Sequence, residues 1–444
     1  MWFNRLETWS EQARTWTDYI ARSSFLLQQG KAVIDVAYFY GEEESATGIN
    51  HARAPQITEG YNYDFVNSEA ILNEFSVRDG KLVTKSGMQY RLLYLAGTSQ
   101  RMTLPVLKKL QSLAEAGAVI VGLPPIDSPS LADNAKDWNA TRNALWPGNG
   151  TQLKVGSGKV YCTLDLAQVL GMEAIAPDFT YIKPDQDSVV QFQHRRDNDT
   201  DIYFVNNRAD HQAYTTADFR VTGKVPELWM ADRGTIEPAS YTIHDGVTTV
   251  PMRLEARDVV FVVFREPAKQ MSHDIPAPLR TPVMAITGPW HVEFEPGRGA
   301  PKSAEFDDLS DWTNNTNPGI KYFSGVATYS QTITLPAFTS DSMAKMELDR
   351  GKVHELAEGI VNGKSVGTAW KPPYRIDITD AVKPGENSLS IKVVTLWPNR
   401  LIGDQQPGAT KVTFVPNSTY KTNDPLLPSG LIGPVSVTRI LRSK

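Results

Sequence analysis

The 444-residue sequence contains one cysteine, Cys162, which excludes an intramolecular disulfide and a zinc site built from thiolates. No segment approaches the roughly 18 apolar residues of a membrane-spanning helix, so no membrane partner is expected. The 45 Lys and Arg residues are outnumbered by 50 Asp and Glu residues, which does not favour nucleic-acid binding. The seven histidines show no paired-ligand spacing, and metal ligands therefore stay unassigned.

The first residues have the periodicity of an amphipathic helix. Apolar residues recur there at spacings of three and four: Leu6, Trp9, Ala13, Trp16 and Ile20. Gly30 is suited to end this helix. Because a domain rarely begins inside a helix, we expect residues 1–31 to be the tail of a catalytic domain that precedes them.

Residues 32–183 alternate between strand and helix patterns. Short apolar runs predict buried parallel strands at 32–40, 90–95, 118–121 and 159–164. Thr103 and Pro105 are suited to begin a helix that Gly117 ends. This alternation predicts an open α/β sheet of the flavodoxin or amidotransferase type.

Beyond Pro184 the apolar period changes to two. Residues 184–267 are predicted to form a small all-β domain, in which Asp245-Gly246 makes a two-residue hairpin turn. The proline-rich residues 268–287 are expected to be a linker. Residues 288–444 are predicted to form a second all-β domain, a jelly-roll-like sandwich with a hairpin turn at Asn362-Gly363.

Two motif matches are better explained as turns. Ser365 fits the G-x-S-x-G pattern of serine hydrolases, but it follows a hairpin turn and no helix comes next. The Gly-rich segment 156–159 lacks two required residues of a phosphate loop, because Leu153 and Val160 stand in their places.

The first candidate site is the aromatic and polar segment 60–67. Tyr61, Asp64 and Asn67 could line a sugar cleft, with rings stacking and polar groups binding hydroxyls. In the alternative, Asn67 or Ser68 is the N-cap of a helix.

An acidic run follows the first predicted α/β strand, where sites in such sheets tend to lie: Glu42, Glu43 and Glu44. A solvated loop is the simpler explanation for it. No general acid paired with a base can be identified, and the catalytic residues are unknown.

The second candidate site has the densest concentration of aromatic residues. Its members follow two predicted strands and together suit a pyranose: Trp370, Tyr374, Trp397, Asn399 and Arg400. The alternative is packing between domains, with Arg400 paired to a carboxylate such as Asp404.

Two families resemble this sequence. The segments 326–335, 348–349, 361–364, 376–380 and 383–387 resemble the sugar-binding jelly roll of family 2 glycosidases, although Gly359 stands where that domain usually has a bulky residue. More narrowly, nearly all 444 positions are similar to the C-terminal part of glycoside hydrolase family 106, the α-L-rhamnosidases. The segments that carry this similarity are 16–22, 26–30, 88–95, 101–105, 396–404 and 427–431.

The family 106 resemblance implies inverting hydrolysis of α-L-rhamnosides by a carboxylate pair and a calcium ion in a barrel that precedes this segment. No residue here matches those glutamates or the calcium ligands, so none is assigned. The implied partners are rhamnose-containing glycans and the missing barrel. The family is often periplasmic or extracellular, although this chain shows no signal peptide.

Three functions stay open. The first is the C-terminal accessory and carbohydrate-binding portion of an α-L-rhamnosidase, inactive alone. The second is a non-catalytic carbohydrate-binding protein. A lesser third is a relative of the family 42 or family 2 β-galactosidases, which also combine an α/β domain with β-sandwiches.

Overall fold

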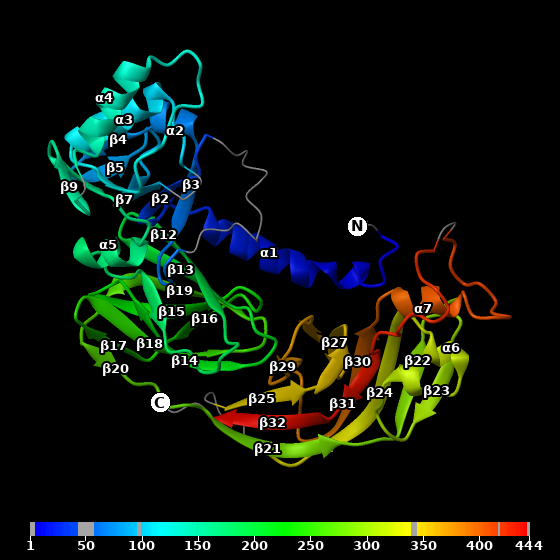
Figure 1. Ribbon diagram of the computed structural model, residues 1–444. Coiled ribbons are helices and arrows are strands. Elements are labelled where there is room, and N and C mark those ends of the chain that lie inside the picture. Colours follow the sequence, from blue (N-terminus) through cyan, green and yellow to red (C-terminus); the bar gives the residue numbers. More distant parts are fainter. Residues whose placement is uncertain are drawn as a thin grey trace. The chain divides into compact units, whose positions relative to one another are not determined.

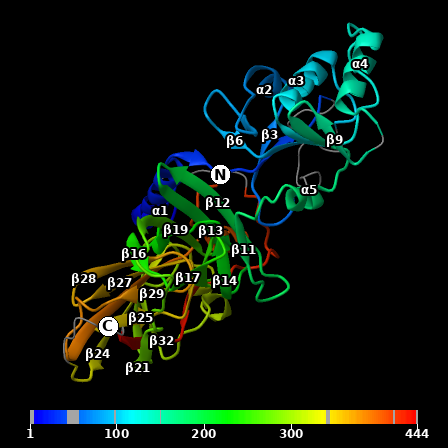
Figure 2. The same cartoon turned by 90° about the vertical axis from the view of Figure 1, so that its left-hand side faces the viewer.

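The computed structural model describes residues 5–42, 57–95, 99–148, 150–338, 344–415 and 418–441. The fold is rich in β-structure and divides into two compact units (Figures 1 and 2). The first unit contains the residues up to Ser24, 231–234 and 274–444, and the second contains 25–230 and 235–273. A multidomain β-rich fold is therefore confirmed.

The second unit contains an open sheet with the order β3-β2-β7-β8-β10-β9, in which β9 is the antiparallel edge strand and the others are parallel. Its strands are β2 (Val36–Phe39), β3 (Tyr63–Val66), β7 (Leu92–Leu95), β8 (Val119–Val121), β9 (Gln152–Val155) and β10 (Gly158–Tyr161). Both faces are apolar because helices cover both. Helices α2 (Ser68–Asn73), α3 (Leu104–Glu115) and α4 (Ala135–Leu145) pack on one face, and α5 (Leu166–Met172) packs on the other (Figure 1).

The predicted single strand at 32–40 was wrong, because the chain changes sheets there. Strand β1 (Lys31–Ala32) pairs with β12 (Val190–Asp197), whereas β2 lies in the parallel sheet. Asp35 lies between them, and its carboxylate pairs with Arg220 at 2.9 Å. A buried carboxylate needs a charged or hydrogen-bonding partner, which an apolar parallel strand does not provide.

Two further sheets of the second unit enclose one apolar core. The six-stranded sheet contains β1, β12, β13 (Thr200–Asn207), β19 (Val259–Pro267), β15 (Lys224–Met230) and β16 (Thr235–Pro238). The five-stranded sheet contains β11 (Phe179–Tyr181), β14 (Ala213–Phe219), β18 (Val247–Leu254), β17 (Tyr241–His244) and β20 (Ser272–His273). A small separate sheet contains β4 (Ser76–Arg78), β5 (Lys81–Val83) and β6 (Gln89–Tyr90). The predicted turn at Asp245-Gly246 is confirmed, since both residues have positive φ.

The first unit contains two larger sheets and a two-stranded one. The six-stranded sheet has the order β23 (Ser303–Phe306), β22 (Trp290–Phe294), β24 (Val326–Leu335), β30 (Gly385–Val394), β27 (Leu356–Val361) and β28 (Lys364–Ala369). The four-stranded sheet has the order β21 (Leu279–Ile286), β32 (Val435–Leu441), β25 (Ala344–Asp349) and β29 (Arg375–Asp377). The pair is β26 (Lys352–His354) and β31 (Gly430–Gly433). The short helices of this unit are η1 (Ser10–Gln12), η3 (Trp312–Asn314), α6 (Pro318–Lys321) and α7 (Pro398–Gly403), and α1 (Ala13–Leu27) belongs to it up to Ser24. The turn predicted at Asn362-Gly363 is confirmed by positive φ at both residues.

One local expectation differs from the structure. Residues 268–287, predicted to be a linker, include strands β20 and β21. Pro282 is tolerated in β21 because the pairing register shifts between it and Met284, where a missing N–H costs little. Strand β27 continues through Gly359, although its pairing with β28 shifts register between Gly359 and Ile360.

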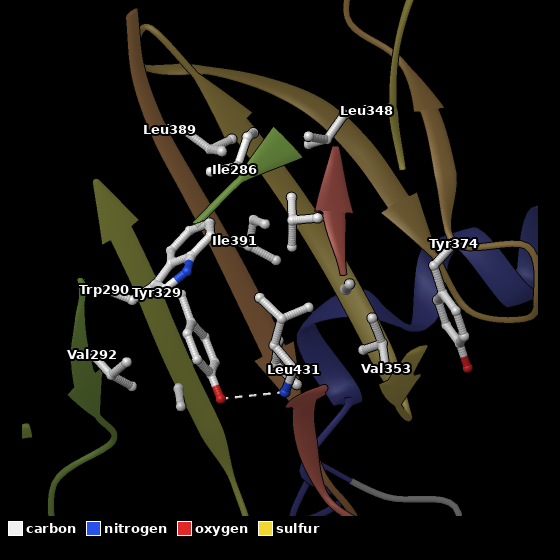
Figure 3. Packing of buried hydrophobic residues seen from close by; sticks show 14 of the residues in the cluster. Ile286, Trp290, Val292, Tyr329, Leu348, Val353, Tyr374, Leu389, Ile391 and Leu431 are labelled. Carbon is white, nitrogen blue, oxygen red and sulfur yellow. Dashed lines mark hydrogen bonds between the residues drawn. The ribbon is translucent and has the colours of Figure 1, made fainter. Parts of the chain in front are cut away.

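The core of the first unit lies between its sheets and contains large aromatic side chains (Figure 3). Tyr329 is fully buried, and its ring stacks on that of Trp312 with an interplanar angle of 7°. Its hydroxyl accepts a hydrogen bond from the Leu431 N–H at 3.2 Å, which joins β24 to β31 (Figure 3). The polar tip of this core residue is thus satisfied by backbone.

Replacing Tyr329 by Phe is expected to lower the free energy of unfolding of the first unit by about 1–3 kcal/mol, because the buried Leu431 N–H loses its acceptor. Urea unfolding measures this change. Tyr322→Phe is the matched control, since no hydrogen bond of its hydroxyl occurs within the described residues. Equal stability of the two variants would contradict the prediction.

Candidate functional site

The second predicted site forms a rim at one edge of the six-stranded sheet of the first unit. Strands β28 and β30 are both antiparallel to β27, so they run in the same direction. Their C-terminal ends therefore lie along the same side of the sheet, which we call its edge here. Trp370 directly follows β28, and Trp397 is the N-cap residue of α7 just beyond β30. The topology therefore accounts for two tryptophans at one edge; we call them the aromatic rim.

Trp397 is half-buried and held on two sides. Its indole N–H donates to the Leu6 carbonyl at 2.9 Å. The Arg298 guanidinium lies 4.4 Å from the ring centroid, and Glu295 holds that guanidinium at 2.9 Å. One ring face is thus occupied by a cation, which fixes the orientation of the indole.

Trp370 is also half-buried and contacts α1. Its ring lies 5.2 Å from that of Tyr19. The adjacent Lys371 ammonium lies 3.4 Å from a carboxylate oxygen of Asp232. The aromatic rim is therefore supported within the first unit by α1 and by residues 231–234.

The other three members of this predicted site are buried beneath the rim. Tyr374 donates to the Glu355 carbonyl, and burial raises the pKa of Tyr374 to about 12. The Asn399 amide makes two hydrogen bonds to the Leu427 backbone, at 2.7 and 2.8 Å. Arg400 pairs with Asp404 at 3.0 Å, which is the pairing that the packing alternative predicted.

Arg350 is fully buried, and within the described residues its guanidinium hydrogen-bonds to backbone carbonyls and to no carboxylate. Its guanidinium donates to the carbonyls of Tyr374 at 3.0 Å and Ala357 at 2.6 Å. Burial lowers the pKa of Arg350 to about 10, so it keeps its charge at neutral pH. This side chain fixes the backbone from which Tyr374 extends.

The residues of the first predicted site each bond to a different element. The Tyr61 hydroxyl donates to the Ile175 carbonyl at 2.7 Å, and Asp64 accepts from the Tyr90 hydroxyl at 2.9 Å. Asn67 is the N-cap of α2, as the alternative predicted. None of these three side chains lines the cleft to which the partner residues Ile175 and Tyr90 contribute.

The acidic run has a structural use at its first member. Glu42 accepts from the backbone N–H and the hydroxyl of Thr103, at 2.7 and 3.0 Å, and so caps α3. Glu43 and Glu44 lie outside the described residues. Both motif explanations are confirmed, since Ser365 lies within β28 and the 156–157 turn joins β9 to β10.

Within the described residues, no group of three or more His, Cys, Asp or Glu side chains is arranged to hold a metal ion. The calcium ion implied by the family resemblance thus has no matching acidic donor set there.

Sequence reasoning missed a buried charge cluster in the second unit, formed by Asp35, Asp178, His194, Asp201 and Arg220. His194 has one ring nitrogen 2.9 Å from Asp178 and the other 3.0 Å from Asp201. Arg220 lies 2.9 Å from Asp35 and 3.4 Å from Asp178. The cluster connects the start of the parallel sheet with four strands or strand ends of the β-rich part, those of β11, β12, β13 and β14.

Two carboxylates on one imidazole favour its doubly protonated form. Burial alone would lower the pKa of His194, but hydrogen bonds to Asp178 and Asp201 raise it above its ordinary value. Burial would raise the pKa of Asp201, yet hydrogen bonds from His194, Arg196 and Lys224 hold it at about 2. The only sequence signal was a histidine at an inward position of the alternating strand β12.

Comparisons with known proteins match this chain to glycoside hydrolases. A family model described as alpha-L-rhamnosidase matches residues 1–243. The solved structure of a rhamnosidase from Novosphingobium sp. PP1Y is 43% identical, with a TM-score of 0.93, over 99% of this chain and 42% of that one. A protein of Formosa agariphila whose name assigns it to the beta-glucuronidases is 27% identical over 98% of this chain and 58% of its own length. The chain thus spans about half the length of these relatives. Among the described residues, no helix has the length and apolarity to cross a membrane.

The stability of the second unit is expected to depend on pH through this cluster. Because folding raises the pKa of His194, protonation of His194 stabilises the fold. This contribution is complete at a pH below 6.5, the ordinary pKa of histidine, and is lost as the pH rises through the folded pKa. The lowered pKa of Asp201 stabilises the fold above 3.8, and this contribution is lost as the pH falls toward about 2. Urea unfolding should therefore show greatest stability from these groups between about pH 4 and 6.5.

His194→Gln should lower the free energy of unfolding by about 3–5 kcal/mol at pH 6 and reduce its decline above that pH, because two buried carboxylates lose their cation. His244→Gln, at a half-exposed histidine of the same unit, is the control. An unchanged alkaline decline in His194→Gln would contradict the prediction.

Proposed function

Because the chain belongs to glycoside hydrolase family 106, the α-L-rhamnosidases, we propose that it is the accessory and carbohydrate-binding portion of such an enzyme. The observation that carries this proposal is the shared fold with a solved rhamnosidase along 99% of the chain, which spans only 42% of that protein. Rhamnose-containing glycans are the proposed ligands, and the proposed location is periplasmic or extracellular.

The distribution of carboxylates supports a non-catalytic role for this portion. Inversion requires two carboxyl groups about 6.5–9.5 Å apart around the scissile bond. The larger cleft of the second unit is lined by one carboxylate, Asp35, which pairs with Arg220. A shallow hollow around Tyr214 and Arg253 is lined by none. We therefore propose that the acid and base lie in a catalytic barrel outside these residues.

The aromatic rim supports the carbohydrate-binding part of the proposal. Indole faces stack on the apolar faces of sugars, and Trp370 and Trp397 retain partial exposure at one sheet edge. The buried Tyr374, Asn399 and Arg400 stabilise the segments that carry these two tryptophans. A jelly-roll sugar-binding domain is the fold that this arrangement favours for residues 288–444. The same rim would serve a non-catalytic carbohydrate-binding protein, which is the second candidate.

The purified chain is expected to release no nitrophenol from an aryl α-L-rhamnoside above the buffer rate, with or without a calcium chelator. The reason is the proposed location of the acid and the base in a barrel outside these residues. Chelator-sensitive turnover would refute this prediction and place the catalytic residues within these 444 positions. Asp35→Asn would then be the first variant to test, since Asp35 is the carboxylate in the larger cleft.

Trp397→Ala is expected to weaken binding of rhamnose-containing oligosaccharides about tenfold, because a stacking face is lost. Isothermal titration calorimetry measures this. Trp229→Ala is a closely matched control, since Arg265 lies 5.3 Å from that ring and its indole N–H bonds to Glu227. Similar losses in both variants, or none in either, would count against the rim as the sugar site.

A further inference from the structure

The second unit contains a cleft of about 580 Å³ that the proposed function does not use. Residues 31–35, 87–91 and 174–176 form most of its wall. Single side chains complete it: Lys81, Arg196, Asn198 and Arg220. All of these residues belong to the same unit. The volume lies in the range of clefts that hold small molecules, about 300–1,000 Å³.

The lining of this cleft is strongly cationic although the chain has a net charge of -5. Its cations are Lys31, Lys81, Arg91, Arg196 and Arg220, and its one acidic residue is Asp35. Two of the cations are already paired, Arg220 with Asp35 at 2.9 Å and Arg196 with Asp201 at 2.6 Å. The carboxylate of the lining is therefore not available to the other three.

The other three cations have no direct partner among the described residues. In the part of the chain that the structure describes, the side chains of Lys31, Lys81 and Arg91 form no hydrogen bond or ion pair. Arg91 interacts with Asp35 and Glu173 through longer-range charge alone. Like charges around one cleft repel one another, and an anion placed between them would relieve that repulsion.

The backbone brings one of these cations close to the opposite wall. A Cβ at Gly87 would lie 2.3 Å from the Lys31 ammonium nitrogen, so the absence of a side chain there makes room for it. Gly87 has a φ of +83°, which other residues rarely adopt. Gln89 and Asn198 add uncharged amides to the lining, and such groups exchange hydrogen bonds with hydroxyls.

We propose that this basic cleft binds an acidic saccharide through its carboxylate or sulfate group. The unpaired cations would hold the anionic group, and the amides would hold the sugar hydroxyls. The site is separate from the aromatic rim and has different ligand chemistry, since rhamnose is uncharged. A failure of this proposal can therefore be distinguished from a failure of the proposed function.

Calorimetry on the full chain at low ionic strength tests the proposal with three probes: oligogalacturonate, sulfated dextran oligosaccharides and uncharged dextran oligosaccharides. The double variant Lys81→Ala/Arg91→Ala removes two charges from the cleft. The control variant Lys136→Ala/Lys154→Ala removes one charge from α4 and one from β9, so its net charge equals that of the cleft variant. We expect the cleft variant to bind the acidic probe about tenfold more weakly, the control variant to bind as the parent does, and uncharged dextran not to bind.

Binding of oligogalacturonate alone would identify a carboxylate ligand, and binding of sulfated dextran alone would identify a sulfate ligand. Equal losses of affinity for the acidic probe in the cleft and control variants would overturn the proposal, because they would indicate nonspecific electrostatic attraction. Binding of inorganic sulfate without either acidic saccharide would overturn it as well. Thermal unfolding of each variant establishes that the fold is retained. Lys81→Arg is expected to retain the affinity for the acidic probe that Lys81→Ala loses.

Discussion

The second unit depends on one constraint, which is that a charge removed from water must meet an opposite charge. His194 meets it with two aspartates, and Asp178 is shared with Arg220. Through Asp35, the same cluster reaches the point at which the chain enters the parallel sheet. Removing one partner of a buried pair costs far more than the pair contributes, so these residues act together. The cluster thus links strand β12 through His194, the residue between β1 and β2 through Asp35, and the lining of the cleft through Arg220.

The sequence predicted those features that local contacts determine. Asp245-Gly246 and Asn362-Gly363 require only their own positive φ values, and both turns are present. Residues 326–335, one of the segments that resemble the family 2 jelly roll, form β24, whose burial alternates except at Gln331. The split at Asp35 could not be predicted, because its partner Arg220 lies 185 positions away.

The candidate sites show the same division. Asn67 capping α2 and Arg400 pairing with Asp404 are contacts within three or four residues, and the sequence was sufficient to raise both. Burial of Tyr374 depends on Arg350 and on the neighbouring sheet, which periodicity does not reveal. The basic cleft combines three distant segments. Spacing along the chain could not have indicated it.

The hydrogen bond between the Trp397 indole and the Leu6 carbonyl has a thermodynamic consequence. It joins positions 391 residues apart within the first unit, so the orientation of a rim tryptophan and the ordering of the segment around Leu6 share one free energy. Linkage makes such sharing reciprocal. Whatever orders that segment favours the stacking orientation of the ring, and a ligand that fixes the ring orders the segment to the same extent.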